Sequence, residues 1–426
     1  MENLLIMGID TRPMVNSALK LNYKTISISY FKDSDFPETF AERHVFNPEQ
    51  DNSYGSFEEA YSPQDLLDLL NEFDIDLIDK IVLTTGISAD DFRGEFSKLK
   101  GRIRGNSNTS NVNDKFKFYE KTRNKFNVPL TFKVSDVDEL KEIIKQYDNN
   151  SFILKPLNGS GGLGFLKLNN DSSNQLNNIK KMVENISLEN YILQEYIEGE
   201  NVSSSVLSTK DEARNLINTR LITANDLGND DYAYVGNIVP LDENSFNVLN
   251  FENKITTANS KNKTPANSKK YGKNEIADLN KEMKDVSEDL IKEFKLIGSN
   301  GVDFKIDTQK EDLKIIEVNP RLQGTYQLCE NSLGINMLDA HIKACEGELI
   351  EIPKPKQYSI KKIVYAPKDV IIRDLKIRNL YDIPYNGEII EKDNPIATII
   401  CSNKDLKTAI NDLKTSNHKL NKALNI

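Results

Sequence analysis

Polar side chains alternate with apolar ones near residue 317. In the stretch "LKIIEVNPRLQGT", residues 313–325, the apolar residues predict a buried strand, whereas Glu317, Asn319 and Arg321 occupy every second position. Residues two positions apart point to the same face of a strand, so an acid, an amide and a cation share one face. Burying such groups without partners costs several kcal/mol each. We therefore expect them either to satisfy one another or to hold a charged ligand.

A second acid, Asp303, lies in the strand-like segment "GSNGVDFKID", residues 298–307. A hairpin of the two strands would bring Asp303, Glu317 and Asn319 side by side. Three oxygen ligands on adjacent strands suit Mg²⁺, which shares its coordination shell with phosphates and water. Arg321 could then bind a phosphoryl group or a carboxylate through two hydrogen bonds. The alternative is a structural network of these residues, but two acids and one cation would leave excess negative charge buried, which favours a cation site.

A glycine-rich stretch, "SFILKPLNGSGGLGFLKL", covers residues 151–168, and its Gly159, Gly161 and Gly164 have the spacing of a dinucleotide-binding loop. That loop requires a helix after the glycines. Here "GFLKL" predicts a strand, and no Gly-Lys-Ser/Thr follows to make a P-loop. The pattern instead predicts a hairpin whose glycines let backbone N–H groups approach phosphates, with Lys155 adding positive charge. A surface turn without a ligand is the alternative.

Composition excludes several classes of function. The net charge of −10 argues against nucleic acid as the main partner, because that interaction needs a basic surface. Three cysteines without a CxxC pair predict neither a disulfide framework nor a zinc site, and three scattered histidines argue against a His-based centre. The start of the sequence lacks the features of a signal peptide, and no run of about 18 apolar residues occurs. We expect a soluble, cytoplasmic protein without a membrane partner.

The first part of the chain predicts an open α/β sheet. Residues 1–110 alternate strand-like runs ("NLLIMGI", "KTISISYF", "DKIVLTTG") with helix-like ones, of which "SPQDLLDLLNEF" begins with a capping box. Arg12 follows the first strand, where α/β sheets usually place ligands. It could meet an anionic substrate there or form a surface salt bridge.

The second half of the chain combines an amphipathic helix, an insertion and a β-rich tail. Apolar residues spaced by three and four predict a helix over 276–297. Residues 253–274 contain six lysines, no acids and almost nothing apolar, which predicts a disordered basic insertion, with a docking patch as the alternative. Residues 355–426 predict a small, mostly β region closed by a helix.

Five motifs in order give the sequence its resemblance to a known family. The stretches "NDKFKFYEK", "ILKPLNGSGGLGF", "ILQEYIEGENVSSSV", "GVDF" and "IIEVNPRLQG" fall within residues 113–325. In this order they resemble the ATP-grasp superfamily, and the two ends of the chain resemble the flanking domains of its biotin-carboxylase-like branch, in particular predicted ATP-dependent carboligases of archaeal type. The resemblance implies a fold that is α/β and α+β. Its parts would be an N-terminal open α/β (pre-ATP-grasp) domain, a two-subdomain ATP-grasp fold and a small C-terminal mostly-β domain, with boundaries 1–110, 111–190 (small subdomain with the glycine loop), 191–352 (large subdomain with the metal site) and 353–426.

The resemblance also implies roles for individual residues. Arg321 would stabilise an acyl-phosphate, and Asn201 stands where an acid often contacts the ribose, with Glu200 one place away. ATP would be held by two lysines, by the loop 158–164 and by the hinge that meets the adenine, namely by Lys115, Lys155, Gly159, Ser160, Gly161, Gly162, Gly164, Gln194, Glu195 and Ile197. Mg²⁺, or alternatively Mn²⁺, would be coordinated by Asp303, Glu317 and Asn319.

One departure bears on the reaction. Biotin carboxylases typically carry a Glu two residues after the Gln that Gln323 matches, and here that position is Thr325. The resemblance therefore implies an ADP-forming carboxylate–amine ligase that works through an acyl-phosphate on small-molecule carboxylate and amine substrates, as a monomer or a homodimer. Carboxylation through carboxyphosphate and a nucleotide-binding regulator without catalysis are the alternatives. An NAD-dependent oxidoreductase is disfavoured, because no helix is predicted after Gly164.

Overall fold

The computed structural model describes most of the chain. The described residues are 1–47, 61–147, 149–157, 164–168, 187–224, 233–248, 271–308 and 310–426. Residues 158–163 of the predicted glycine loop and 253–270 of the predicted insertion lie outside them. The last residues of that predicted insertion are ordered, because Tyr271 is buried with its ring 4.7 Å from that of Phe246 and a helix begins at Lys273.

The N-terminal region forms the predicted open α/β sheet. Its four parallel strands have the order β3-β2-β1-β4 and comprise β1 (Glu2–Gly8), β2 (Tyr23–Ser29), β3 (Ala41–His44) and β4 (Lys80–Leu83). The accompanying helices are α1 (Arg12–Ala18) and α4 (Pro63–Asp68), with short 3-10 turns over Leu69–Glu72, Ile75–Leu77, Ala89–Asp91 and Gly94–Arg102. The capping box at Ser62 is present, because the Ser62 N–H donates to Asp65 Oδ2 and the Ser62 Oγ accepts from the Gln64 N–H.

A small antiparallel sheet carries the strands on either side of the glycine loop. Its order is β5-β8-β6-β7, with β5 (Thr131–Lys133), β6 (Phe152–Pro156), β7 (Leu166–Leu168) and β8 (Tyr191–Glu195). Helices α5 (Ser110–Asn113), α6 (Lys115–Thr122) and α7 (Val137–Gln146) precede the glycine loop, and a 3-10 turn covers Leu188–Asn190. Strand β7 pairs with β6, with Phe152 opposite Leu168, so a strand and not a helix follows Gly164. This pairing confirms the predicted hairpin and excludes the dinucleotide-binding geometry.

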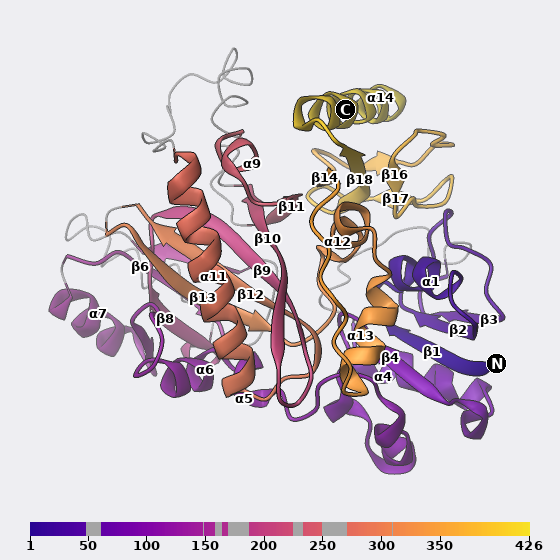
Figure 1. Ribbon diagram of the computed structural model, residues 1–426, viewed down its shortest axis with the longest axis horizontal. Helices are drawn as coiled ribbons and strands as arrows, with labels where there is room; N and C mark the ends of the chain where they lie inside the picture. The colour runs from indigo at the N-terminus through magenta and orange to yellow at the C-terminus, as the bar shows by residue number, and fades with distance from the viewer. Residues whose placement is uncertain are drawn as a thin grey trace.

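A large antiparallel sheet forms the centre of the molecule (Figure 1). Its order is β13-β12-β9-β10-β11-β14-β18-β16. The strands are β9 (Gly199–Ser208), β10 (Ala213–Thr223), β11 (Tyr234–Val239), β12 (Gly298–Asp307), β13 (Asp312–Asn319), β14 (Tyr358–Tyr365), β16 (Leu380–Tyr381) and β18 (Pro395–Asn403). The C-terminal strands therefore extend the central sheet through the β11–β14 pairing. The predicted domain boundaries themselves stay a prediction.

Helices cover the central sheet and connect it to its neighbours. They are α9 (Glu243–Asn247), α11 (Lys273–Glu293), α12 (Tyr326–Leu333), α13 (Met337–Cys345) and α14 (Leu406–Leu424), and a two-stranded ribbon pairs β15 (Val370–Ile371) with β17 (Ile389–Ile390). Helix α11 ends before residue 297, because Lys295 takes a positive φ of 53° and turns the chain into β12.

Apolar packing fixes the N-terminal sheet against α13. Leu4 and Ile6 of β1 and Val15 of α1 belong to the same buried cluster as Leu338 and Ile342 of α13. Figure 1 shows α13 between the N-terminal sheet on the right and the central strands. Fully burying such side chains contributes roughly 1.5–3 kcal/mol each, so this contact holds the carboxyl ends of β1 and β4 in a defined place.

Candidate active site

The predicted hairpin of acids is present. Strands β12 and β13 pair antiparallel, with Asp303 directly opposite Glu317 and Gly301 opposite Asn319. Side chains directly opposite one another on such a pair are neighbours on one face of the sheet. The register also shifts between Asp303 and Phe304, a local irregularity of the kind that often re-aims a side chain next to a functional site.

A chain of hydrogen bonds runs along this face. Asn319 Nδ2 donates to Asp303 Oδ2 at 2.8 Å, and Arg321 Nη2 donates to Asn319 Oδ1 at 3.2 Å. These contacts do not neutralise the pair of acids: burial and the facing Glu317 raise the pKa of Asp303 to about 8. Burial lowers the pKa of Arg321, and the two carboxylates oppose that effect. Burial and the facing Glu317 thus disfavour the ionised form of Asp303, and a bound cation would favour it, as expected for a cation site.

Lys155 lies close to the acids, on strand β6. Its side chain is 8% exposed, and its Nζ donates to Gln194 Oε1 at 2.7 Å and lies 5.0 Å from the centre of the Phe165 ring. Gln194 Nε2 in turn donates to Thr131 Oγ1 at 3.0 Å. Burial lowers the pKa of Lys155 to about 8, and the charge of Glu317 limits the drop. The structure thus brings Lys155 and Gln194 together, with the Gln194 side chain positioning the lysine.

Lys115 approaches the same carboxylate from the start of α6. Burial lowers its pKa, and Glu317 is the strongest group that opposes the decrease. Glu317 therefore acts electrostatically on both lysines and on Arg321. Three cations around one carboxylate indicate that Glu317 is at the centre of the site.

The remaining predicted residues occupy different surroundings. Glu195 is 7% exposed, and its carboxylate accepts hydrogen bonds from the Leu130 N–H and from Asn150 and is paired with Lys310 at 3.2 Å. Its side chain therefore holds the ends of β5, β6 and β12 together. Ile197 is buried, and its predicted contact with the adenine, which would use its backbone, stays a prediction.

Asn201 lies on β9 opposite Lys305 of β12, and its carbonyl oxygen accepts from Arg220 Nη1 at 2.7 Å. The neighbouring Glu200 pairs with Arg220. Four of the predicted glycine-loop residues lie outside the described part of the chain, namely Gly159, Ser160, Gly161 and Gly162. Gly164 takes a φ of +71°, a conformation that favours glycine, at the entry to β7.

Thr325 belongs to an uncharged cluster beside the acids. Its Oγ1 lies 3.1 Å from Ser205 Oγ and 3.3 Å from Gln323 Oε1, and Ser205 Oγ donates to Gln323 Oε1 at 3.1 Å. Gln323 Nε2 is buried and has no hydrogen-bond partner among the described residues. This position offers hydroxyl and amide groups but no carboxylate.

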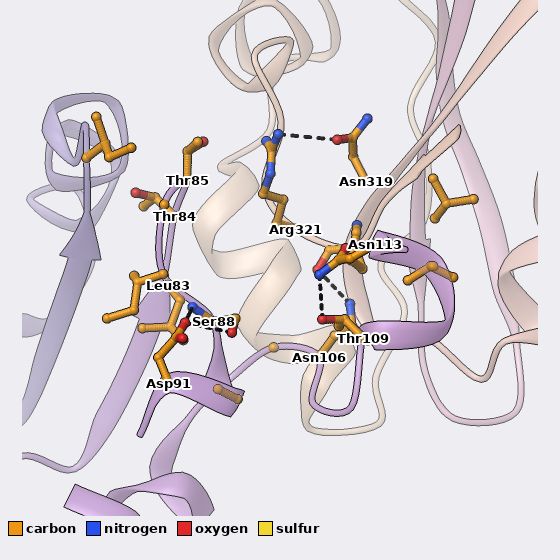
Figure 2. Close-up of a pocket in the computed structure, with 18 of the residues that line it drawn as sticks. Leu83, Thr84, Thr85, Ser88, Asp91, Asn106, Thr109, Asn113, Asn319 and Arg321 are labelled. Carbon is orange, nitrogen blue, oxygen red and sulfur yellow. Dashed lines mark hydrogen bonds between the residues drawn. The ribbon is translucent and has the colours of Figure 1, made fainter. Parts of the chain in front are cut away.

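A cavity of about 790 Å³ opens between this face and the N-terminal sheet. Asn319 and Arg321 line one side, and Thr84 and Thr85, which follow β4, line the other (Figure 2). Glu317 also lines the cavity. Lys115 and Gly164, both predicted to hold ATP, also line the cavity, whereas Ser88, Asn106 and Thr109 come from segments that the sequence analysis did not single out. The available signal was their position after β4, since α/β sheets bind ligands at the carboxyl ends of their strands.

Arg12 does not line this cavity. Its side chain is 1% exposed and is paired with Asp382 and Asp35. Both expectations for Arg12, a contact with an anionic substrate and a surface salt bridge, are therefore wrong: its side chain is buried and paired with Asp35 and with the distant Asp382.

Comparison with protein families gives two matches that overlap. The model of the ATP-grasp domain matches residues 112–261, and the model described as "ATP-grasp in the biosynthetic pathway with Ter operon" matches residues 235–366. The uncharacterized protein MJ0776 of Methanocaldococcus jannaschii is 29% identical over 415 residues, which cover 96% of this chain and 90% of that protein.

Solved structures share the fold over almost the whole chain. Biotin carboxylase of Campylobacter jejuni, solved with β,γ-ATP, has a TM-score of 0.70 at 15% identity, with coverage of 98% of this chain and 91% of that chain. The biotin carboxylase domain dimer of 2-oxoglutarate carboxylase from Hydrogenobacter thermophilus, solved with MgADP, ADP and bicarbonate, has a TM-score of 0.67 at 16% identity, covering 98% and 89%. N5-carboxyaminoimidazole synthetase of Staphylococcus aureus has a TM-score of 0.64 at 15% identity, covering 97% of both chains.

These likenesses confirm the fold class predicted from the sequence. Among the described residues, none of the helices has both the length and the apolar character needed to cross a membrane.

Proposed function

The chain belongs to the ATP-grasp superfamily, and from this premise we propose that it is an ATP- and Mg²⁺-dependent ligase that joins a carboxylate to an amine. The carboxylate would attack the γ-phosphate of ATP to give an acyl-phosphate and ADP, and the amine would then displace phosphate. The observation that carries the proposal is the position of the paired acids Asp303 and Glu317. They face the buried Lys155 and the partly exposed Lys115, and Glu317 and Lys115 both line the cavity that reaches the N-terminal sheet.

The paired acids suit a divalent cation. Asp303, Glu317 and Asn319 offer oxygen atoms on two adjacent strands, and hard oxygen ligands are those that Mg²⁺ prefers, with Mn²⁺ as an alternative. The raised pKa of Asp303 reflects its burial and the charge of the facing Glu317. When bound, Mg²⁺ would neutralise charge on the phosphates of ATP.

The cations around Glu317 would hold the transferring phosphoryl group. Lys155 and Lys115 approach from the small sheet and α6, and Arg321 from the end of β13. Electrostatic contacts in a site shielded from water act more strongly than in solution, and preorganised charges need no rearrangement during the reaction. In this chain Gln194 keeps the Lys155 ammonium in place through the 2.7 Å hydrogen bond.

The cavity would bind the carboxylate substrate. Arg321 lies at its boundary, where it could orient a carboxylate for attack on the phosphoryl group. Thr84, Thr85 and Ser88 contribute mostly hydroxyl and backbone groups, so the distal part of the substrate would be recognised by hydrogen bonds. In this proposal the N-terminal domain would recognise the substrate.

A second candidate is carboxylation through carboxyphosphate. It is favoured by the likeness to the biotin carboxylase domain solved with bicarbonate. Against it stands the uncharged cluster of Ser205, Gln323 and Thr325, which supplies no carboxylate at the position where that reaction would use one. ADP formation that depends on bicarbonate alone would favour this candidate.

The proposal is tested by a screen of paired substrates. Purified protein is incubated with ATP, Mg²⁺ and combinations of carboxylates and amines, phosphate release is followed, and products are identified by mass. A condensed product with ADP and phosphate supports the ligase. ATP binding without ADP formation in every combination would point to the third alternative, a nucleotide-binding regulator. A homodimer would be consistent with the dimer in which the Hydrogenobacter thermophilus domain was solved, and light scattering tests it.

A further inference from the structure

A second cluster of acids lies where the two ends of the chain meet. Asp10 follows β1, Asp33 follows β2, and Asp382 follows β16 in the C-terminal region. One carboxylate oxygen from each lies within 4.8 Å of those of the other two. Backbone contacts bring the segments together as well, because the Ser34 N–H donates to the Ile383 carbonyl at 2.7 Å. The cluster does not share residues with the cavity described above.

The cations at this cluster do not balance its acids. The charged groups that face one another are Asp10, Arg12, Asp33, Asp35, Lys361 and Asp382. With every group ionised, four carboxylates face two cations, which leaves a formal charge of −2. Arg12 is already engaged, since its Nε donates to Asp382 Oδ1 at 2.7 Å and its Nη2 donates to Gln327 Oε1 at 3.3 Å. Lys361 Nζ is directed to the Gly324 carbonyl at 3.4 Å.

Asp33 has no partner of its own. Its side chain is 9% exposed, and among the described residues its carboxylate makes neither a hydrogen bond nor an ion pair. Burial and the charges of Asp382 and Asp10 raise its pKa well above the usual value. An unpaired buried carboxylate is costly, and buried charges in proteins are normally paired or coordinate a metal. Asp33 is therefore an independent indication that a positive ligand belongs here.

We propose that Asp10, Asp33 and Asp382 bind one hard divalent metal cation that connects the N-terminal sheet to the C-terminal strands. Asp10 Oδ1 accepts from the Arg12 N–H at 3.0 Å, which leaves the second oxygen of Asp10 for the cation. Asp382 accepts from Arg12 Nε and from the Thr398 side chain, and its carboxylate would give the cation a remaining lone pair. All donors are carboxylate oxygens, which suits Mg²⁺, Mn²⁺ or Ca²⁺ rather than softer metals. A charge of +2 matches the formal excess of −2.

The binding of this cation would couple two distant segments. Asp10 and Asp33 come from the carboxyl ends of β1 and β2, whereas Asp382 comes from the C-terminal part of the chain, after β16. A bound cation would hold these ends together and stabilise the folded protein in proportion to its concentration. It would do so without taking part in ATP chemistry, so this site is independent of the proposed function.

The test counts bound Mn²⁺ in the full chain without nucleotide. Electron paramagnetic resonance detects free Mn²⁺, and the difference from the Mn²⁺ added gives the number of ions bound. The protein carries Glu317→Gln, which weakens the site at Asp303. We expect the Glu317→Gln protein to keep one bound Mn²⁺. The additional change Asp33→Asn should remove it, whereas Asp285→Asn, the same change on an exposed residue of α11, should leave it bound.

Thermal unfolding gives a second measurement of Mn²⁺ binding if few bound ions are counted. Asp33→Asn removes one negative charge from a cluster of carboxylates that repel one another. The melting temperature of the Asp33→Asn protein in EDTA should therefore equal or exceed that of its parent. Mn²⁺ should raise the melting temperature of the parent but not that of the Asp33→Asn protein. A Glu317→Gln protein that binds no Mn²⁺, or an Asp33→Asn protein that binds and responds as its parent does, would overturn the proposal.

Discussion

Binding of a divalent cation at Asp303 should release a proton. Because burial and Glu317 raise the pKa of Asp303 to about 8, this carboxyl is protonated in about nine molecules out of ten at pH 7 when no cation is bound. A metal ligand must be deprotonated, so cation binding displaces that proton. The apparent affinity for Mn²⁺ should therefore rise about tenfold per pH unit up to about pH 8 and change little above it.

Calorimetry in buffers of different ionisation enthalpy measures the released protons. The measurement uses the Asp33→Asn background, so that the second cluster of acids does not contribute. We expect a release of about 0.9 proton per Mn²⁺ at pH 7 and almost none at pH 9. Glu317→Gln removes one of the charges that raise this pKa, and should lower the release at pH 7. Release that is absent at pH 7, or that persists unchanged after Asp303→Asn, would refute the assignment.

The same pKa predicts the sign of a stability effect. A carboxyl whose pKa is raised on folding stabilises the folded state at low pH, and this contribution is lost as the pH rises through the folded value. For the metal-free protein the free energy of unfolding should fall between about pH 4 and about pH 8, by at most about 1.4 kcal/mol per pH unit from Asp303. Mn²⁺ should therefore raise the melting temperature more at pH 8 than at pH 6.

Three further outcomes follow from the same geometry. Glu317→Gln should reduce ATP turnover at least 100-fold with an unchanged circular dichroism spectrum, because it removes a metal ligand and a partner of both lysines. The control Glu142→Gln, on the exposed face of α7, should leave turnover within twofold of the unchanged protein, and equal rates for the two variants would contradict the role of Glu317. Turnover should decline as the pH rises above about 8, because the Lys155 ammonium loses its proton there, and a pH–rate profile that stays flat to pH 10 would contradict its contact with phosphate. Arg12→Ala should lower the free energy of unfolding by about 3–5 kcal/mol, since it leaves Asp382 without its partner, and a loss below 1 kcal/mol in denaturant titrations would show that the pair contributes little.

The acid face of the site could be predicted because it depends on local rules. A period of two places Glu317 and Asn319 on one face, and a short connection between β12 and β13 makes the hairpin with Asp303 the simplest pairing. The strand after Gly164 was predictable for the same reason, since β-type alternation continues beyond the glycines.

Long-range partners could not be predicted from such rules. The pairing of β11 with β14 joins Ile238 to Ile360, and no local pattern indicates which distant strand will extend a sheet. The burial of Arg12 depends on Asp382, which lies far away in the sequence, so the surroundings of Arg12 could not be predicted from the sequence alone. Likewise Glu195 is held by Asn150 and Lys310, whose positions follow from the assembled sheets.

The central claim is that a carboxylate of the substrate receives the γ-phosphoryl group of ATP beside Asp303 and Glu317. Its most direct test is the transfer of oxygen-18 from labelled carboxylates to the released phosphate, measured by mass spectrometry together with ADP. We expect one labelled oxygen in phosphate for the true carboxylate, with both label and ADP lost in Glu317→Gln. The claim would be contradicted if ADP formed and the carboxylate was consumed, but the released phosphate carried no oxygen-18.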